Sequence, residues 1–146
     1  MGILEQLEID YDLDITNEFM THLSVMTVAL EPLIIGLNSE QNFPMNLQEL
    51  FRIFSNVHSA AKFLKLEDVE RLTKLCMNLI GDAMEEHGDH NIASTEFIDW
   101  MLLAADQLNG YQKDLEYDSE HFRPLNPTII KIPQILVADA TKKHAN

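Results

Sequence analysis

The sequence predicts an all-α protein, an antiparallel four-helix bundle followed by an extended C-terminal arm. Apolar residues recur at helical spacing in four long segments, and short connections join those segments. Near the end of the chain, Pro124, Pro127 and Pro133 exclude a continuous helix. We therefore expect a bundle over residues 1–112 and a C-terminal extension over residues 113–146, partly packed on the bundle or flexible.

The first predicted helix runs from about Thr16 to Leu37. Asp14 or Thr16 can cap its start, and Gly36 favours its end. Its apolar residues lie three and four positions apart, which is typical of one helix face. They are Phe19, Met20, Leu23, Met26, Leu30, Leu33 and Ile34.

The second and third predicted helices cover about residues 46–64 and 67–87. Asn46, with Glu49 three residues later, can form a capping box at the start of the second helix. Gly88 follows the third helix and favours its end.

A fourth helix is predicted to begin after Ser94 or Thr95 and to end near Gly110. Beyond Tyr111 the composition changes, and the apolar residues of the arm must be shielded from water. We expect part of the arm to pack on the bundle, and an unbound arm that docks on a partner is the alternative. The apolar residues concerned are Ile129, Ile130, Ile132, Ile135 and Leu136.

The formal charge of −14 argues against a nucleic-acid partner, because such partners require clustered basic residues. No Lys or Arg precedes Arg52, and half of the ten basic residues then fall within one short region. Such a basic patch can steer an acidic partner, although a solvated helix face explains it equally well. The five residues are Arg52, Lys62, Lys65, Arg71 and Lys74.

The sequence also favours a cytoplasmic location without membrane insertion. The single cysteine, Cys76, lies in an apolar stretch, as expected of a small buried side chain in a reducing compartment. The N-terminal residues lack a basic region followed by an apolar run, and we expect no membrane-spanning segment.

The second predicted helix has two different faces. Leu50, Ile53 and Val57 belong to an apolar face, which we expect in the core. Opposite it runs a polar stripe that we expect to face solvent. This stripe consists of Gln48, Arg52, Ser55, Ser59 and Lys62.

The segment LFRIFSNVHSAAKFLKL, residues 50–66, carries a family resemblance. It is similar to the motif of histidine phosphotransfer (HPt) domains, especially those of chemotaxis histidine kinases, in which LFRxxHxxKGxxxFLGL is typical. The resemblance implies a four-helix domain whose histidine passes a phosphoryl group to a response-regulator aspartate. The matching residues are Leu50, Phe51, Arg52, Phe63, Leu64 and Leu66.

In the ungapped alignment, the phosphoacceptor position of the family falls on Ser55, and the family's lysine falls on His58. The family's small residues fall on Ser59, Lys62 and Lys65. Aligning His58 with the phosphohistidine instead requires a deletion of three residues. That deletion would turn the rest of the helix about 60° out of face, so we prefer the ungapped alignment.

A serine cannot replace the histidine in this chemistry. Its hydroxyl is a weak nucleophile without an adjacent base, and a phosphoserine ester is too stable to donate its phosphoryl group readily. His58 can act as an alternative phosphoacceptor through a neutral ring nitrogen, or it can be a half-buried histidine with a structural hydrogen bond.

The sequence therefore predicts a signalling module that binds a response-regulator receiver domain or a histidine kinase, without enzymatic turnover or a cofactor. The expected partner-binding residues are Arg52, Ser59, Lys62 and Lys65, around Ser55. An active phosphotransfer protein that uses His58 is one alternative, and a structural helical bundle unrelated to phosphorelays is another. No metal site is expected, since the group around His87 and His90 is better explained as a helix end.

Overall fold

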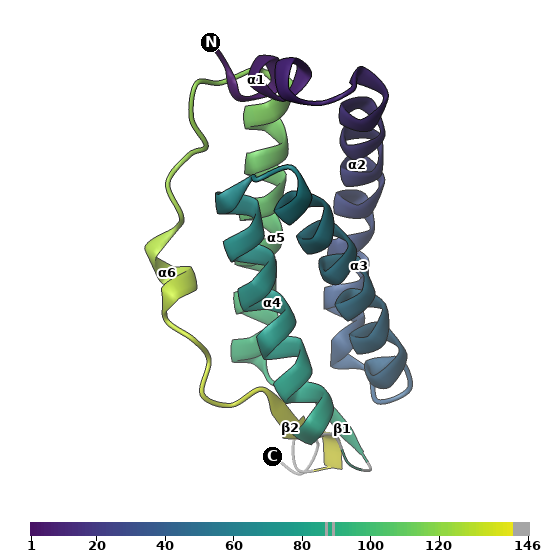
Figure 1. Cartoon of the computed structure of the whole chain (residues 1–146). Helices are drawn as coiled ribbons and strands as arrows, with labels where there is room; N and C mark the ends of the chain where they lie inside the picture. Colours follow the sequence, from purple (N-terminus) through teal and green to yellow (C-terminus); the bar gives the residue numbers. More distant parts are fainter. Residues whose placement is uncertain (87, 89, 142–146) are drawn as a thin grey trace.

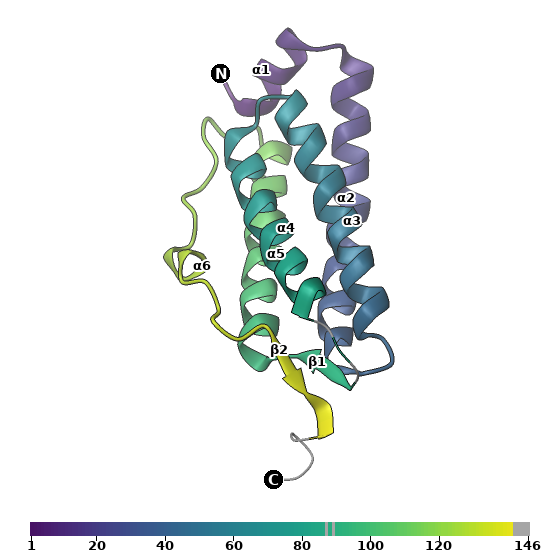
Figure 2. The same cartoon turned by 60° about the horizontal axis from the view of Figure 1, so that its bottom comes forward.

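The computed structural model is mostly helical, with two short strands, and it describes residues 1–86, 88 and 90–141. Four long helices lie side by side along the molecule (Figures 1 and 2). They are α2 (Leu13–Ile35), α3 (Phe43–Phe63), α4 (Glu67–Glu86) and α5 (Thr95–Glu116). Helix α3 packs on α4, and α2 packs on both α3 and α5. The prediction of an all-α protein is confirmed in this broad form.

One shared core fills the space between the four long helices. The apolar helix faces predicted from the sequence form this core. Burial of each large aliphatic or aromatic side chain contributes about 1.5–3 kcal/mol to the stability of the fold. Cys76 is part of this core, as predicted, and burial raises the pKa of its thiol. Core residues that are almost fully buried include Leu23, Leu30, Leu50, Phe54, Ile80, Phe97, Met101 and Leu108.

Helix α3 begins earlier than predicted, at Phe43, because Pro44 suits the first turn of a helix. Asn46 therefore lies inside the helix, and its Nδ2 donates a hydrogen bond to the carbonyl of Leu33, 3.0 Å away, at the end of α2. A side chain at Gly36 would collide with the Asn46 amide. The predicted capping box of Asn46 and Glu49 is wrong, since Asn46 links α3 to α2 instead.

Helix α5 continues to Glu116, although Gly110 predicts its end. Gly110 instead leaves room for the C-terminal arm, because a Cβ there would lie 2.8 Å from Cδ of Arg123. The domain boundary predicted between residues 112 and 113 accordingly falls inside a helix.

A short helix that the sequence analysis missed, α1 (Ile3–Asp10), crosses one end of the long helices (Figure 1). The backbone N–H of Ile3 donates to the carbonyl of Ser119 at 2.8 Å. Beyond α1, the Tyr11 hydroxyl donates to the carbonyl of Phe63 at 3.1 Å. These contacts join the N-terminus to the ends of α3 and α5.

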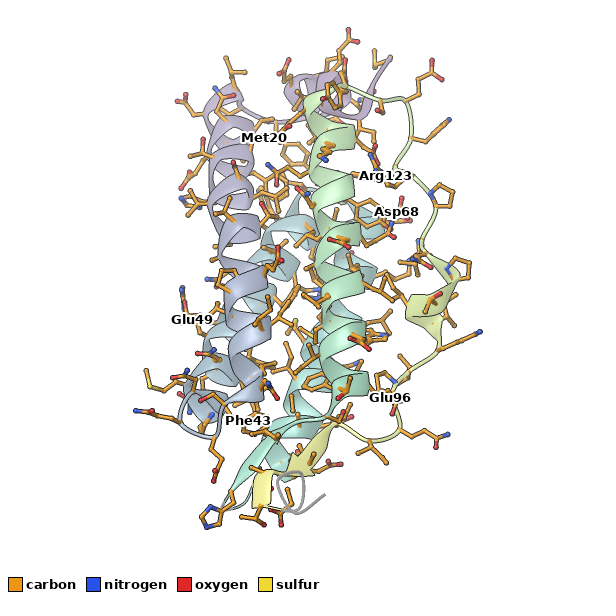
Figure 3. The ribbon with its side chains drawn as sticks, turned by 180° about the vertical axis from the view of Figure 1, so that it is seen from behind. Met20, Phe43, Glu49, Asp68, Glu96 and Arg123 are labelled. Atoms are coloured by element: carbon orange, nitrogen blue, oxygen red, sulfur yellow. The ribbon has the colours of Figure 1, made fainter. Side chains whose placement is uncertain are left out.

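The C-terminal arm packs along the helices, with α6 (Pro127–Ile130) at its middle. Its strand β2 (Val137–Asp139) pairs antiparallel with β1 (Asn91–Ala93). Figure 3 shows Arg123 between the arm and α5. Of the five apolar arm residues expected to need cover, the buried ones are Ile129 and Leu136, whereas Ile130, Ile132 and Ile135 are exposed.

Helix α2 is unusually apolar for a helix of which only a small part is buried. By length and composition, the segment Leu13–Asn38 meets the criteria for a membrane span, with a mean hydropathy of 1.5, although only 22% of its most apolar window is buried here. This segment includes the 3-10 turn η1 (Gly36–Asn38). By length and composition this helix comes closer to a membrane span than the sequence was expected to allow, and the absence of a membrane-spanning segment stays a prediction. The cytoplasmic location stays a prediction.

Candidate functional site

Ser55 lies near the middle of α3, and its hydroxyl is covered by neighbouring atoms. The residue is half-buried, and its Oγ has no hydrogen-bond partner among the described residues. Ser55 is rotated about 40° around the helix from Ser59. The prediction that Ser55 faces solvent is wrong for its hydroxyl, which is covered although its neighbours in the polar stripe, Arg52, Ser59 and Lys62, are exposed.

His58 lies in the contact between α3 and α4. Its Nδ1 is 3.0 Å from the carbonyl oxygen of Glu70 and 3.1 Å from Oγ1 of Thr73. A carbonyl oxygen only accepts hydrogen bonds, so Nδ1 must carry a proton. In the neutral ring, Nε2 then carries the lone pair. The half-buried His58 is thus held by α4 through its Nδ1.

Three of the predicted partner-binding residues, Arg52, Ser59 and Lys62, are exposed on α3. Arg52 forms an ion pair with Glu49 one turn earlier. The hydrogen bond from Arg52 lowers the pKa of the Glu49 carboxyl, and the same bond raises the pKa of Arg52. Because both side chains are solvent-exposed, this pair contributes little to stability and leaves Arg52 available to a partner.

Lys65 occupies the turn between α3 and α4 with a left-handed backbone, at a φ of 59°. The backbone N–H of Leu66 donates to the carbonyl of Ala61 at 2.9 Å, and that of Lys65 donates to Lys62 at 3.2 Å. These two bonds form a Schellman motif, which normally places glycine at the left-handed position. This motif was not predicted, although the family glycine that aligns with Lys65 is a signal for it.

We name the surface formed by Arg52, Ser59, Lys62 and Lys65 the α3 outer face. All four side chains are exposed, and the three cationic ones make it locally basic. Arg71 and Lys74 on the adjacent helix α4 are exposed as well. The arrangement can attract an acidic partner, but Ser55, with its covered hydroxyl, supplies no accessible nucleophile beside it.

The possible metal site of the sequence analysis lies partly outside the described residues, which do not include His87 or Asp89. His90 is described, and its Nδ1 lies 2.7 Å from Oε1 of Glu40. In the described part of the chain, no three His, Cys, Asp or Glu side chains gather closely enough to hold a metal ion.

Comparisons of the chain with protein-family models, with curated proteins and with solved structures gave no match. The HPt resemblance therefore remains a prediction that rests on residues 50–66.

Proposed function

We propose that this protein is a signalling module that binds a response-regulator receiver domain, or a histidine kinase, without passing on a phosphoryl group. In this proposal the four long helices are an antiparallel bundle of the HPt type, and the α3 outer face is the docking surface. The observation that carries the proposal is an open, basic helix face next to a serine at the phosphoacceptor position.

The turn after α3 supports the family assignment. The HPt motif has a glycine where this chain has Lys65, and Lys65 adopts the left-handed conformation that glycine favours. Such a conformation is uncommon for a residue with a side chain. Its presence at the aligned position favours a backbone inherited from a glycine-containing turn over an accidental match of letters.

The chemistry of Ser55 supports binding without transfer. Phosphoryl transfer needs an accessible nucleophile, and the Oγ of Ser55 is covered and has no hydrogen-bonded base among the described residues. A phosphoserine ester would also be a poor donor to an aspartate. Docking needs none of this chemistry, because it depends on the shape and charge of the exposed face.

Electrostatic complementarity supports an acidic partner for this face. The phosphorylation pocket of a receiver domain is acidic, and Arg52, Lys62 and Lys65 present positive charge on a chain whose formal charge is −14. Local complementarity of this kind mainly raises the association rate and selects the partner.

A binding assay tests the proposal. Receiver domains from the organism that encodes this chain are titrated one at a time against the full-length protein, and we expect at least one to bind. Lys62→Glu should weaken that binding about tenfold, whereas Lys131→Glu on the arm should change it less than about twofold. Equal effects of the two variants, or no binding by any receiver domain, would favour the structural-bundle alternative.

One observation favours a second candidate function, active phosphotransfer through His58. Donation from Nδ1 to Glu70 leaves the lone pair on Nε2 in the neutral ring, which is the state a phosphoacceptor needs. Under this alternative, a phosphorylated receiver domain would label the wild-type chain with acid-labile phosphate and would leave His58→Gln unlabelled.

A further inference from the structure

A groove of about 470 Å³ lies between α2 and α5. Figure 3 looks onto this side of the molecule and shows the C-terminal arm along the other flank of α5. Val28 of α2 lines the groove and is 77% exposed, and the half-buried Leu102 and Ala105 line it from α5. The groove therefore presents apolar surface to solvent.

Two carboxylates, Glu31 of α2 and Asp106 of α5, line the same groove from opposite walls. Thr27 of α2 and Gln112 of α5 lie at one level, because Oγ1 of Thr27 donates to Oε1 of Gln112 at 2.7 Å. Glu31 follows Thr27 by about 6 Å along α2. Asp106 precedes Gln112 by about 9 Å along α5. Because α2 and α5 run antiparallel (Figure 1), both displacements go the same way, and the two carboxylates differ in level by only about 3 Å.

The charge of this groove is negative. Both carboxylates are exposed, and neither forms a hydrogen bond or an ion pair with another described residue. Helix α2 contains no Lys or Arg, and the one basic residue of α5 is Lys113, four residues beyond the lining residue Asn109. At the other end, Asp99 precedes the lining residue Leu102 by three residues and offsets that charge. The groove lining itself carries two negative charges and no cation.

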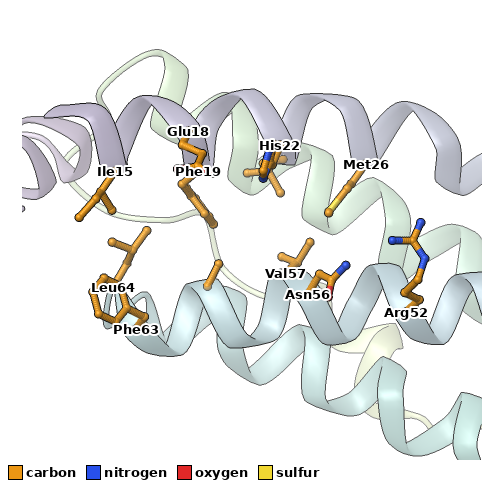
Figure 4. Close-up of a pocket in the computed structure, with 12 residues that line it drawn as sticks. Ile15, Glu18, Phe19, His22, Met26, Arg52, Asn56, Val57, Phe63 and Leu64 are labelled. Atoms are coloured by element: carbon orange, nitrogen blue, oxygen red, sulfur yellow. The ribbon is translucent and has the colours of Figure 1, made fainter. Parts of the chain in front are cut away.

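The groove between α2 and α3 differs in this respect (Figure 4). Glu18 and Arg52 both line it, and Lys62 and Lys65 flank its end at Phe63. Its charges are therefore mixed and select no occupant, whereas those of the α2–α5 groove have one sign.

We propose that the groove between α2 and α5 binds a basic segment of a partner protein. A Lys or Arg side chain of that segment lies between Glu31 and Asp106, where it forms charge-assisted hydrogen bonds with both walls. A neighbouring apolar side chain of the segment lies against Val28 and Leu102. From Leu102 to Asn109 the groove follows α5 for about 10 Å, which matches about two turns of a bound helix.

Charge selects this occupant over two others. A second copy of the chain in a symmetric pair would place Glu31 and Asp106 of both copies in one interface, where like charges repel. An anionic lipid surface would be repelled for the same reason. The site goes beyond the proposed function, because α2 and α5 take no part in the α3 outer face and the occupant is basic rather than acidic.

A synthetic peptide serves as the probe, because the sequence of the partner is unidentified. The peptide has about 12 residues, with leucine along one helical face and arginine beside it, and carries a fluorophore for anisotropy titration against the full chain. We expect saturable binding that Glu31→Gln or Asp106→Asn weakens about fivefold. Glu8→Gln and Asp82→Asn are the matched controls. They remove the same charge from exposed positions on α1 and α4, and each should change binding less than about twofold.

Two further arms test the apolar contact and the charge of the peptide. Val28→Ser should weaken binding about fivefold, and Val25→Ser less than about twofold. Val25 is the control because it is 66% exposed on the same helix and does not line the groove. A peptide with glutamine in place of arginine should bind at least about tenfold more weakly.

Three outcomes would overturn the proposal. They are the absence of saturable binding to a chain with native circular dichroism, equal effects of the groove variants and their controls, and equal binding of the glutamine peptide. Self-association of the chain that Val28→Ser abolishes would assign this face to a second copy instead. Glu31→Gln should leave receiver binding unchanged, so failure here is distinct from failure of the proposed function.

Discussion

Asp114 of α5 accepts a hydrogen bond from the backbone N–H of Arg123 at 2.8 Å and another from its guanidinium at 2.9 Å. The side chain of Asp114 is 10% exposed, and that of Arg123 is 47% exposed. The pair holds the arm against α5 at the position where Gly110 leaves room for it. One carboxylate therefore fixes both the backbone and the side chain of the arm.

Removing the charge of Asp114 should destabilise the protein. Asp114→Asn loses the ionic part of several hydrogen bonds, and we expect the free energy of unfolding to fall by about 1–2 kcal/mol, since the exposed side of Arg123 is screened by solvent. Urea denaturation measures the change. Asp106→Asn, an exposed position on the same helix, should stay within about 0.5 kcal/mol of the wild type.

The same pair predicts a pH dependence of stability. Burial acts to raise the pKa of Asp114, but the hydrogen bonds and charge of Arg123 outweigh it, and the pKa lies below its ordinary value. The pair should therefore contribute fully above the unfolded pKa of about 3.9, and the contribution should disappear as the pH falls through the folded pKa. Urea denaturation of the wild type and Asp114→Asn between about pH 3 and pH 7 should show their difference shrinking only at the acidic end. A difference that grows on acidification would contradict this linkage.

Two adjacent isoleucines of the arm should differ strongly in their contribution to stability. Ile129 is fully buried, and its carbonyl accepts a hydrogen bond from Nε1 of Trp100 at 2.8 Å, whereas Ile130 is exposed. Ile129→Ala should cost about 2–4 kcal/mol through the cavity it leaves, and Ile130→Ala less than about 0.5 kcal/mol. Thermal or urea unfolding of both variants measures the contrast. Similar small effects would mean that the arm is not packed in solution.

Lys65 should be a site where glycine stabilises the protein. Its φ of 59° is costly for a residue with a Cβ, so Lys65→Gly should raise the free energy of unfolding by about 0.5–1 kcal/mol. Lys62→Gly, within α3, should lower it by a similar amount, because glycine weakens a helix. These two Lys→Gly variants, three residues apart, should therefore change the free energy of unfolding in opposite directions in one denaturation experiment.

The long helices were predictable from the sequence because their signals are local. Apolar spacing located α2, α3, α4 and most of α5. The observed helix ends differ from the predicted ones where contacts with distant segments determine them. Gly110 was misinterpreted as a stop because Arg123, which fills the space beside it, lies on the arm. The pairing of β1 with β2 depends on a contact between distant segments, and such short strands carry little periodic signal.

The candidate site was predictable only in part. Helical spacing identified the exposed positions Arg52, Ser59 and Lys62, but it could not show which side-chain atoms the fold covers. The hydroxyl of Ser55 is covered, and α4 holds His58 through Glu70 and Thr73. The groove between α2 and α3 was missed because periodicity marks Phe19 and Val57 as core without showing that the two helices leave space between them.

The most direct test of the proposed function measures binding and transfer together. A receiver domain that binds the chain is phosphorylated and incubated with it, and the complex and the acid-labile phosphate on the chain are then quantified. We predict a complex that Lys62→Glu weakens and no acid-labile label on the chain. Acid-labile label on the wild type, lost in His58→Gln while binding remains, would contradict the account and show that His58 is a working phosphoacceptor.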